Sequence, residues 1–187
     1  MTINYHRAGA GPTVVLIHGI AHHWQAWQPV IPHLASSFDV IACDSPGFGR
    51  SAPLPAGVEP TVGAYADAFA AFFSELGVEH PHVAGNSMGG AIALELARRQ
   101  AVRSVTAFSP AGFWTPGERR FAQLSLDILR SVPRPARPAV RALAATRLGR
   151  TVLFKQIFGW PTRIPPDEAV STLDDAWAAP AFAETLA

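Results

Sequence analysis

The hexapeptide Gly85-Asn86-Ser87-Met88-Gly89-Gly90 decides the fold class of this chain. It has the form Gly-x-Ser-x-Gly, it follows the apolar run His82-Val83-Ala84, and it opens a helical pattern that continues to Arg99. A serine hydroxyl is a poor nucleophile unless it is held in the open beside a base, and a sharp strand-to-helix turn holds it in this way. The glycines allow the close backbone approach that such a turn needs. The stretch therefore predicts that Ser87 is presented for acyl transfer, with the N–H of Met88 directed at the oxyanion.

The elements around this turn alternate between short apolar runs and helical patterns. Such alternation predicts an α/β fold with a parallel sheet covered on both faces. The expected strands are Thr13–Ile17, Phe38–Cys43, His82–Asn86 and Val102–Phe108, and the expected helices include 65–76 and 88–99, after a short or irregular one over 24–34.

The character of the chain changes at Pro110. From there onward the pattern contains helices and no convincing strand, with apolar residues such as Phe121, Leu124 and Ile128 at helical spacing. We therefore expect an N-terminal α/β core over residues 1–110 and a helical segment over residues 111–187.

Composition limits the classes of partner. The chain has 187 residues, of which 49% are hydrophobic, and a formal net charge of +1, which argues against disorder and against a nucleic-acid partner. No apolar run approaches the roughly 20 residues of a membrane span, and no signal peptide is visible, so a cytoplasmic protein is expected. The single cysteine, Cys43, lies in an apolar run and is expected to be buried. Neither a Cys/His cluster nor a Gly-x-Gly-x-x-Gly loop is present, so the sequence implies no metal and no organic cofactor.

Two further motifs end the strands that precede the Ser87 turn. His18-Gly19-Ile20 follows the first expected strand, and Asp44-Ser45-Pro46-Gly47-Phe48-Gly49-Arg50-Ser51 follows the second. The carboxyl ends of parallel strands form one edge of the sheet, so all three motifs are expected at the same rim. Together, and in this order, they resemble the α/β-hydrolase fold family over about residues 3–108.

The resemblance implies a role for each motif residue. Ser87 would be the nucleophile, and the N–H groups of Met88 and Ile20 would form the oxyanion hole. His18, Gly19, Gly85, Gly89 and Asp44 would be structural residues of the motifs, because Asp44 precedes the serine whereas the family order is serine, acid, histidine. The helical segment resembles the family's cap, and we expect an apolar pocket wall from Phe113, Trp114, Phe121, Phe154, Phe158 and Trp160.

The histidines depart from the family pattern. Family members place the acid and the histidine of the triad on strands after the cap, yet all seven histidines of this chain precede Ser87. His22 and His23 are close to the oxyanion loop, but a base must reach the serine and be oriented by a third group. The simpler interpretation is a truncated core whose last strands are missing, which would leave an apolar parallel edge exposed and favour association.

The leading functional interpretation is a serine-nucleophile hydrolase, esterase-like or C–C-bond-cleaving, acting on a small apolar ester or ketone-like substrate. One alternative is a catalytically inactive module of the same fold that binds a ligand. Another is an acyltransferase or a cofactor-free peroxidase-like protein. The sequence leaves the oligomeric state open. The eight arginines of the stretch 118–150 favour a solvated helix face over a site for an acidic substrate.

Overall fold

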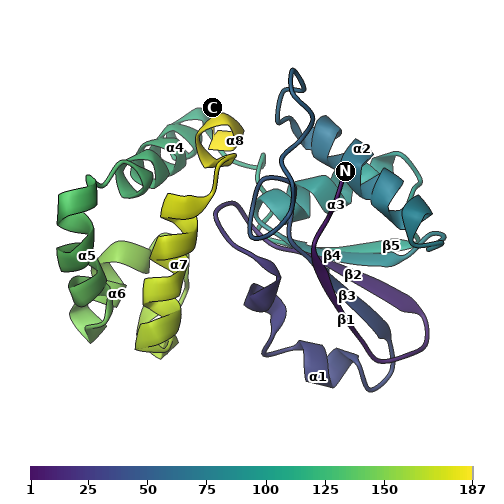
Figure 1. The fold of residues 1–187 in the computed structure, drawn as a ribbon, viewed down its shortest axis with the longest axis horizontal. Coiled ribbons are helices and arrows are strands. Elements are labelled where there is room, and N and C mark those ends of the chain that lie inside the picture. The colour runs from purple at the N-terminus through teal and green to yellow at the C-terminus, as the bar shows by residue number, and fades with distance from the viewer. Residues whose placement is uncertain (187) are drawn as a thin grey trace.

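The computed structural model describes residues 1–186, and it consists of a five-stranded sheet with helices on both faces and a separate group of helices beside it. In Figure 1 the sheet lies on the right and the helices that follow residue 115 lie on the left, joined near the top by the last helix. The two parts meet at the carboxyl edge of the strands. This is the edge at which the three motifs were expected.

The strand order across the sheet is β1-β3-β2-β4-β5. Strands β2 (Thr13–Ile17), β3 (Asp39–Cys43), β4 (His82–Asn86) and β5 (Ser104–Phe108) are parallel, which confirms the expected strands. The sheet is nevertheless mixed, because β1 (Tyr5–Ala8) pairs antiparallel with β3. Strand β1 was not expected: its four residues carry no apolar run, since an edge strand needs none. In the described part of the chain β5 pairs with β4 alone.

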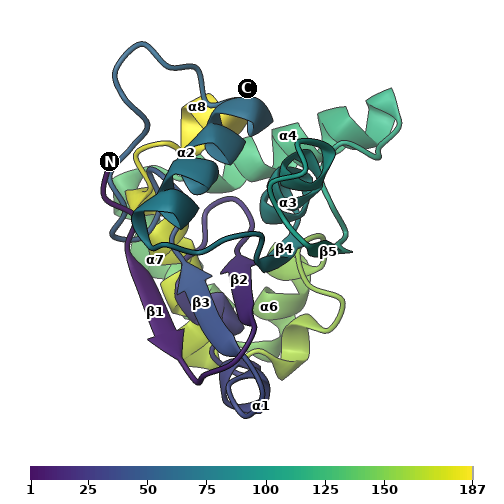
Figure 2. The same cartoon turned by 90° about the vertical axis from the view of Figure 1, so that its right-hand side faces the viewer.

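Two apolar layers enclose the sheet. One lies under α2 (Val62–Glu75) and α3 (Met88–Arg98), and Figure 2 shows these two helices side by side above the strands. The other lies under a 3₁₀ helix (Trp24–Trp27) and α1 (Ile31–Leu34), which is the irregular helix expected from the two prolines nearby. Cys43 is fully buried in the first layer, and burial raises the pKa of its thiol well above the usual value.

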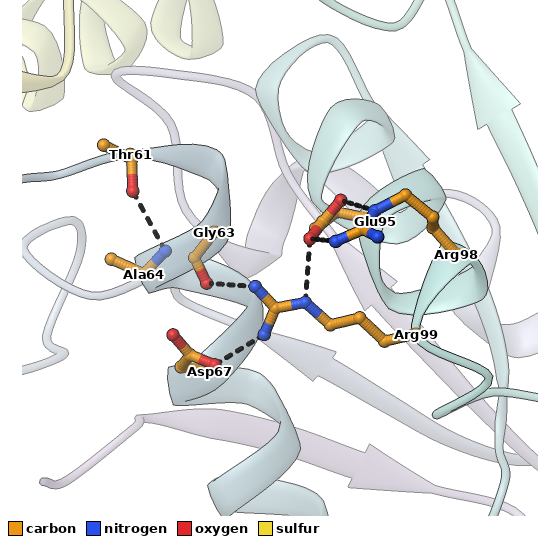
Figure 3. Close-up of polar contacts among 7 residues, drawn as sticks. All are labelled: Thr61, Gly63, Ala64, Asp67, Glu95, Arg98 and Arg99. Carbon is orange, nitrogen blue, oxygen red and sulfur yellow. Dashed lines mark hydrogen bonds and ion pairs between the residues drawn. The ribbon is translucent and has the colours of Figure 1, made fainter.

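A salt-bridge network holds α3 against α2. The Arg99 guanidinium at the end of α3 contacts the Asp67 carboxylate of α2 at 2.5 Å and donates to the main-chain oxygen of Gly63 at 3.2 Å (Figure 3). Its Nε donates to Glu95 at 2.8 Å, and Glu95 also accepts from Arg98. The helix that begins at the Ser87 turn is therefore fixed at its far end to its neighbour.

The second half of the chain is helical. It comprises α4 (Pro116–Arg130), α5 (Arg137–Ala144), α6 (Arg147–Phe154), α7 (Pro166–Ala178) and α8 (Phe182–Leu186), with two short 3₁₀ turns at Arg134–Ala136 and Pro161–Arg163. These helices have a small apolar centre of their own, formed by Ala144, Phe154, Ala169 and Leu173. Helix α8 also packs Phe182 into the layer between the sheet and α2. We refer to residues 116–186 as the helical segment.

Candidate functional site

Ser87 occupies a strained turn between β4 and α3. Its backbone has φ 52° and ψ −114°, a conformation that costs a non-glycine residue roughly 1–3 kcal/mol. The Ser87 N–H donates to the Phe108 oxygen at 3.0 Å, and the Ser87 oxygen accepts from the N–H groups of Ala91 and Ala111 at 3.1 and 3.0 Å. Main-chain hydrogen bonds on both sides thus hold the turn in this conformation and leave the side chain half-buried at the sheet edge.

Gly85 and Gly89 each lie so close to main-chain atoms of a neighbouring segment that a Cβ atom would not fit. A Cβ on Gly85 would lie 2.1 Å from the Gly89 oxygen, and a Cβ on Gly89 would lie 2.2 Å from the oxygen of Ile17 at the end of β2. Gly19 is also near the turn, since its Cβ would lie 3.3 Å from Cβ of Ser87. The loop after β2 and the turn after β4 are therefore in contact.

His18 is buried beneath that loop and joins it to the motif after β3. Its Nε2 accepts the N–H of Ser45 at 2.8 Å, so its proton is on Nδ1, which donates to the Gly19 oxygen at 2.6 Å. Burial lowers the pKa of His18 to about 4, which keeps the ring neutral near pH 7. Because the Gly19 carbonyl and the Ile20 N–H belong to one planar trans peptide, the bond from His18 also directs the Ile20 N–H away from His18.

Asp44 forms hydrogen bonds with three segments that precede the Ser87 turn, at Asn4, Trp24 and Arg50. One carboxylate oxygen accepts from the Trp24 N–H at 2.7 Å, and the other accepts from Asn4 Nδ2 at 2.7 Å and the Arg50 N–H at 2.9 Å. The side chain is almost fully buried, and a Cβ on Gly49 would lie 2.4 Å from it. The carboxylate is thus surrounded by main-chain and amide donors of its own loops.

Two cavities meet at Ser87, between the sheet edge and the helical segment. The first, of about 590 Å³, is bounded by the rings of Trp27, Phe108, Trp114 and Phe158, and we call it the aromatic chamber. The second, of about 700 Å³, has Arg119 and Arg120 on its wall, and we call it the arginine chamber. The residues common to both walls are Ile20, Ser87, Trp114, Ala122 and Leu126.

His22 and His23 lie near this site with different surroundings. His22 is on the wall of the aromatic chamber, its Nδ1 accepts the N–H of His23 at 3.1 Å, and burial lowers its pKa to about 3. His23 contacts the carboxylate of Asp175 on α7 at 2.5 Å, and this hydrogen bond raises its pKa. Within residues 1–186, Ser87 Oγ has no hydrogen bond to either ring or to any other group.

The structure divides the aromatic residues expected in a pocket wall. Trp114 and Phe158 line the aromatic chamber, whereas Phe154 is buried in the centre of the helical segment. Phe113, Phe121 and Trp160 point outward and are at least 63% exposed, so they line neither chamber. Spacing along α4 could have indicated the inner residues, because Ala122, Leu126 and Leu129 follow a second apolar stripe on the helix.

Neither a metal cluster nor a membrane helix is found in the described part. No group of three or more His, Cys, Asp or Glu side chains among residues 1–186 is placed to hold a metal ion. None of the helices described is both long enough and apolar enough to cross a membrane.

A serine in a strained strand-to-helix turn, at the carboxyl edge of a mostly parallel sheet and facing a cavity, defines a class of α/β proteins that present this residue to a ligand. A family model described as the alpha/beta hydrolase fold matches residues 12–157. The chain therefore belongs to the α/β-hydrolase fold family.

Individual relatives extend this similarity. The chain is 41% identical over 114 residues to the dihydrolipoyllysine-residue acetyltransferase component of an acetoin cleaving system from Cupriavidus necator, covering 59% of this chain and 30% of that protein. It is 37% identical over 118 residues to 2-hydroxymuconate semialdehyde hydrolase from Pseudomonas sp. strain CF600, covering 60% and 41% of the two chains. Among solved structures, a bacterial membrane phospholipase A matches with a TM-score of 0.70 and 30% identity, covering 98% of this chain and 57% of that one. The chain thus spans less than half of these two curated relatives.

Proposed function

We propose that this chain provides the serine, the oxyanion hole and the substrate chamber of a serine-nucleophile α/β hydrolase that acts on a small apolar ester or ketone-like substrate. The observation that carries the proposal is the strained backbone of Ser87 at the junction of two cavities. Strain of this kind persists only where the surroundings impose it, and here the main-chain bonds of three segments do so. One relative named as a hydrolase and another named as a methyl ester esterase support the reaction class.

The proposed oxyanion hole consists of the N–H groups of Met88 and Ile20. Neither group donates a hydrogen bond within residues 1–186, and both residues are on the wall of the arginine chamber together with Ser87. We assign His18 and Gly19 to the positioning of Ile20, because the His18 bond to the Gly19 oxygen fixes the peptide that carries that N–H. Asp44 is proposed as a structural acid that holds the loops together.

Neither nearby histidine fits the role of general base. His22 has a pKa of about 3 and uses Nδ1 to accept from His23, so its second nitrogen carries the proton. His23 resembles the histidine of a triad in its pairing with Asp175, but it is on the wall of neither chamber that holds Ser87. Without a base, the oxyanion hole and substrate binding together leave a rate enhancement of roughly 10³ to 10⁴ over water.

The proposal is tested by hydrolysis of p-nitrophenyl butyrate. We expect weak, saturable hydrolysis that is inhibited by a methyl ketone of similar length. Ala122→Trp places a large ring at a position common to both chambers and should abolish saturable hydrolysis. Ala139→Trp on the exposed side of α5 is the matched control and should leave hydrolysis unchanged. Equal hydrolysis by the two variants would contradict the proposed site.

Ser87 Oγ has no hydrogen bond within residues 1–186, which favours a second candidate, a ligand-binding module without catalysis. That candidate predicts ketone binding to the wild-type chain, blocked by Ala122→Trp, together with no hydrolysis above the buffer rate. An acyltransferase is supported by the similarity to the acetyltransferase component from C. necator. It predicts that an added alcohol or thiol accelerates release of p-nitrophenol more than water does.

A further inference from the structure

The eight arginines of the stretch 118–150 fall into two groups in the structure. Four have partners: Arg130 pairs with Asp127 at 2.7 Å, Arg141 pairs with Asp174 at 2.6 Å, Arg137 lies over the ring of Trp177 at 4.9 Å, and Arg150 donates to the Ala145 oxygen at 2.8 Å. The other four guanidinium groups have no hydrogen bond or ion pair within residues 1–186, and they belong to Arg119, Arg120, Arg134 and Arg147.

Two of these unpaired arginines share a cavity with Ser87. Arg119 and Arg120 are on the wall of the arginine chamber, whereas Arg134 and Arg147 line neither chamber. Both chamber arginines belong to the N-terminal half of α4. Two unpaired charges therefore lie on the same chamber wall as Ser87.

The nearest acids in the sequence do not neutralise this pair. The Glu118 carboxylate accepts from the Thr115 N–H and from its hydroxyl, both at 2.8 Å, in a capping box at the start of α4. This hydrogen bonding lowers the pKa of Glu118 and so keeps the carboxylate ionised and engaged at the cap. Asp127, two turns further along α4, lines another surface pocket together with Arg120, but among residues 1–186 its ion pair is with Arg130.

The wall of the arginine chamber is mostly apolar, although Tyr65, Gln123 and Thr185 also line it. Val62, Met88 and Leu126 belong to the same chamber, and they offer contact to a hydrocarbon chain but no charge. A ligand that reaches from Ser87 to the arginines thus needs an apolar middle and an anionic end. Guanidinium groups bind carboxylate and phosphate in a bidentate manner, so either anion satisfies the pair.

Building on the proposed function, we infer that Arg119 and Arg120 form a subsite for an anionic group at the far end of an apolar substrate whose ester or ketone carbon lies at Ser87. The chain then acts on esters or ketones that also carry a carboxylate or a phosphate. A neutral substrate of the same length occupies the chamber without this contact.

The subsite is tested by binding of three matched ligands to the full chain. Nonan-2-one is neutral, 8-oxononanoate adds a terminal carboxylate, and 8-oxononyl phosphate adds a phosphate. The tryptophan fluorescence of the chain, to which Trp114 on the wall of both chambers contributes, reports binding, and calorimetry provides an independent affinity. The variant Arg119→Gln/Arg120→Gln removes both charges, and Arg134→Gln/Arg147→Gln is the charge-matched control.

We expect the tighter-binding of the two anionic ligands to bind about three- to tenfold more tightly than nonan-2-one at low salt, because Arg119 and Arg120 are both exposed. The advantage should vanish in Arg119→Gln/Arg120→Gln, persist in Arg134→Gln/Arg147→Gln, and decrease at high salt because the pair is exposed. The affinity for nonan-2-one should be the same in all three proteins, which also shows that the variants are folded. Comparison of the two anions identifies which of them the subsite prefers.

Two other outcomes overturn the inference, and they are distinguishable. If nonan-2-one binds and neither anionic ligand binds more tightly, or if both double variants lose the advantage equally, the subsite is wrong and the proposed chamber stands. If none of the three ligands binds to the wild-type chain, the proposed chamber is wrong and the subsite falls with it.

Discussion

Replacement of Ser87 by alanine should have almost no effect on hydrolysis by this chain. In a complete serine triad, loss of the serine lowers kcat by about 10⁶, and loss of the histidine alone lowers it by about as much. The two losses are not additive, because the serine contributes only when a base removes its proton. Since Ser87 Oγ has no hydrogen-bonded base within residues 1–186, the residual reaction is attack by water, which needs no serine. We therefore expect Ser87→Ala to change kcat/KM for p-nitrophenyl butyrate by less than about threefold.

A substitution in the loop that carries the Ile20 N–H should lower the residual rate of hydrolysis more than a substitution of Ser87. A Cβ on Gly19 would lie 3.1 Å from Asn86 Oδ1 and 3.3 Å from Cβ of Ser87, so the larger side chain in Gly19→Val must displace the loop that carries the Ile20 N–H. Loss of one oxyanion donor typically lowers the rate by roughly 10² to 10³. We expect Gly19→Val to lower the residual rate by about that factor, so that the usual ranking of the two positions is inverted.

The assay compares initial rates after subtraction of the buffer rate. Ala122→Trp, purified in parallel and expected to lack saturable hydrolysis, measures any contaminating esterase. Circular dichroism melting shows whether Gly19→Val remains folded, and intact mass after incubation with a fluorophosphonate reports the reactivity of Ser87. A loss of about 10³ or more in Ser87→Ala, or stoichiometric labelling of the wild-type serine, would refute the reasoning, since either result requires a base that acts on Ser87.

The remaining predictions concern stability and association. Gly89→Ala should destabilise the fold by about 1–3 kcal/mol or more in denaturant titrations, because its Cβ would lie 2.2 Å from a main-chain oxygen. The control Gly117→Ala, with nothing within 4 Å, should be neutral or stabilising by up to about 1 kcal/mol. The lowered pKa values of His18 and His22, about 4 and about 3, mean that the unfolded chain binds the extra protons as pH falls below 6.5. Stability should therefore decrease from pH 6.5 toward pH 4 by about 1.4 kcal/mol per pH unit for each histidine, and a flat profile would contradict both shifts. Because β5 has one free edge among the described residues, the chain should associate, and Thr106→Lys on its exposed face should lower the apparent mass in sedimentation; a wild-type monomer would refute this.

The parallel strands and the turn could be predicted from the sequence because their signals are local. A strand buried on both faces must be apolar throughout, as in Thr13–Ile17, and a turn that excludes every Cβ must contain glycine, as at Gly85 and Gly89. Strand β1 has no comparable signal. Its residues alternate between exposed and half-buried positions at the sheet edge, and its hydrogen bonds to β3 come from the main chain, which any sequence can provide.

The sequence predicts that the helical segment is helical, but it does not predict which face of each helix points inward. Helix α4 has two apolar stripes, one with Phe121, Leu124 and Ile128 and the other with Ala122, Leu126 and Leu129. Larger side chains favour burial of the first stripe, yet each of its three residues is more than 60% exposed. The second stripe lines the aromatic chamber instead, so the sizes of the side chains on the helix do not decide which stripe faces inward. The pairing of arginines with acids is also non-local, since Arg141 of α5 finds Asp174 on α7.

The same distinction separates a presented serine from an activated one. Presentation depends on a few adjacent residues. In this chain the turn between β4 and α3, with Gly85 and Gly89 on its two sides, places the Ser87 hydroxyl at the edge of the sheet. Activation depends on a proton acceptor whose basicity is set by distant groups. His22 and His23 are neighbours in the sequence, yet burial makes the first a very weak base and a carboxylate on α7 makes the second a stronger one directed elsewhere. A Gly-x-Ser-x-Gly stretch therefore predicts where a reaction would take place, whereas the surroundings of the histidines decide whether it does.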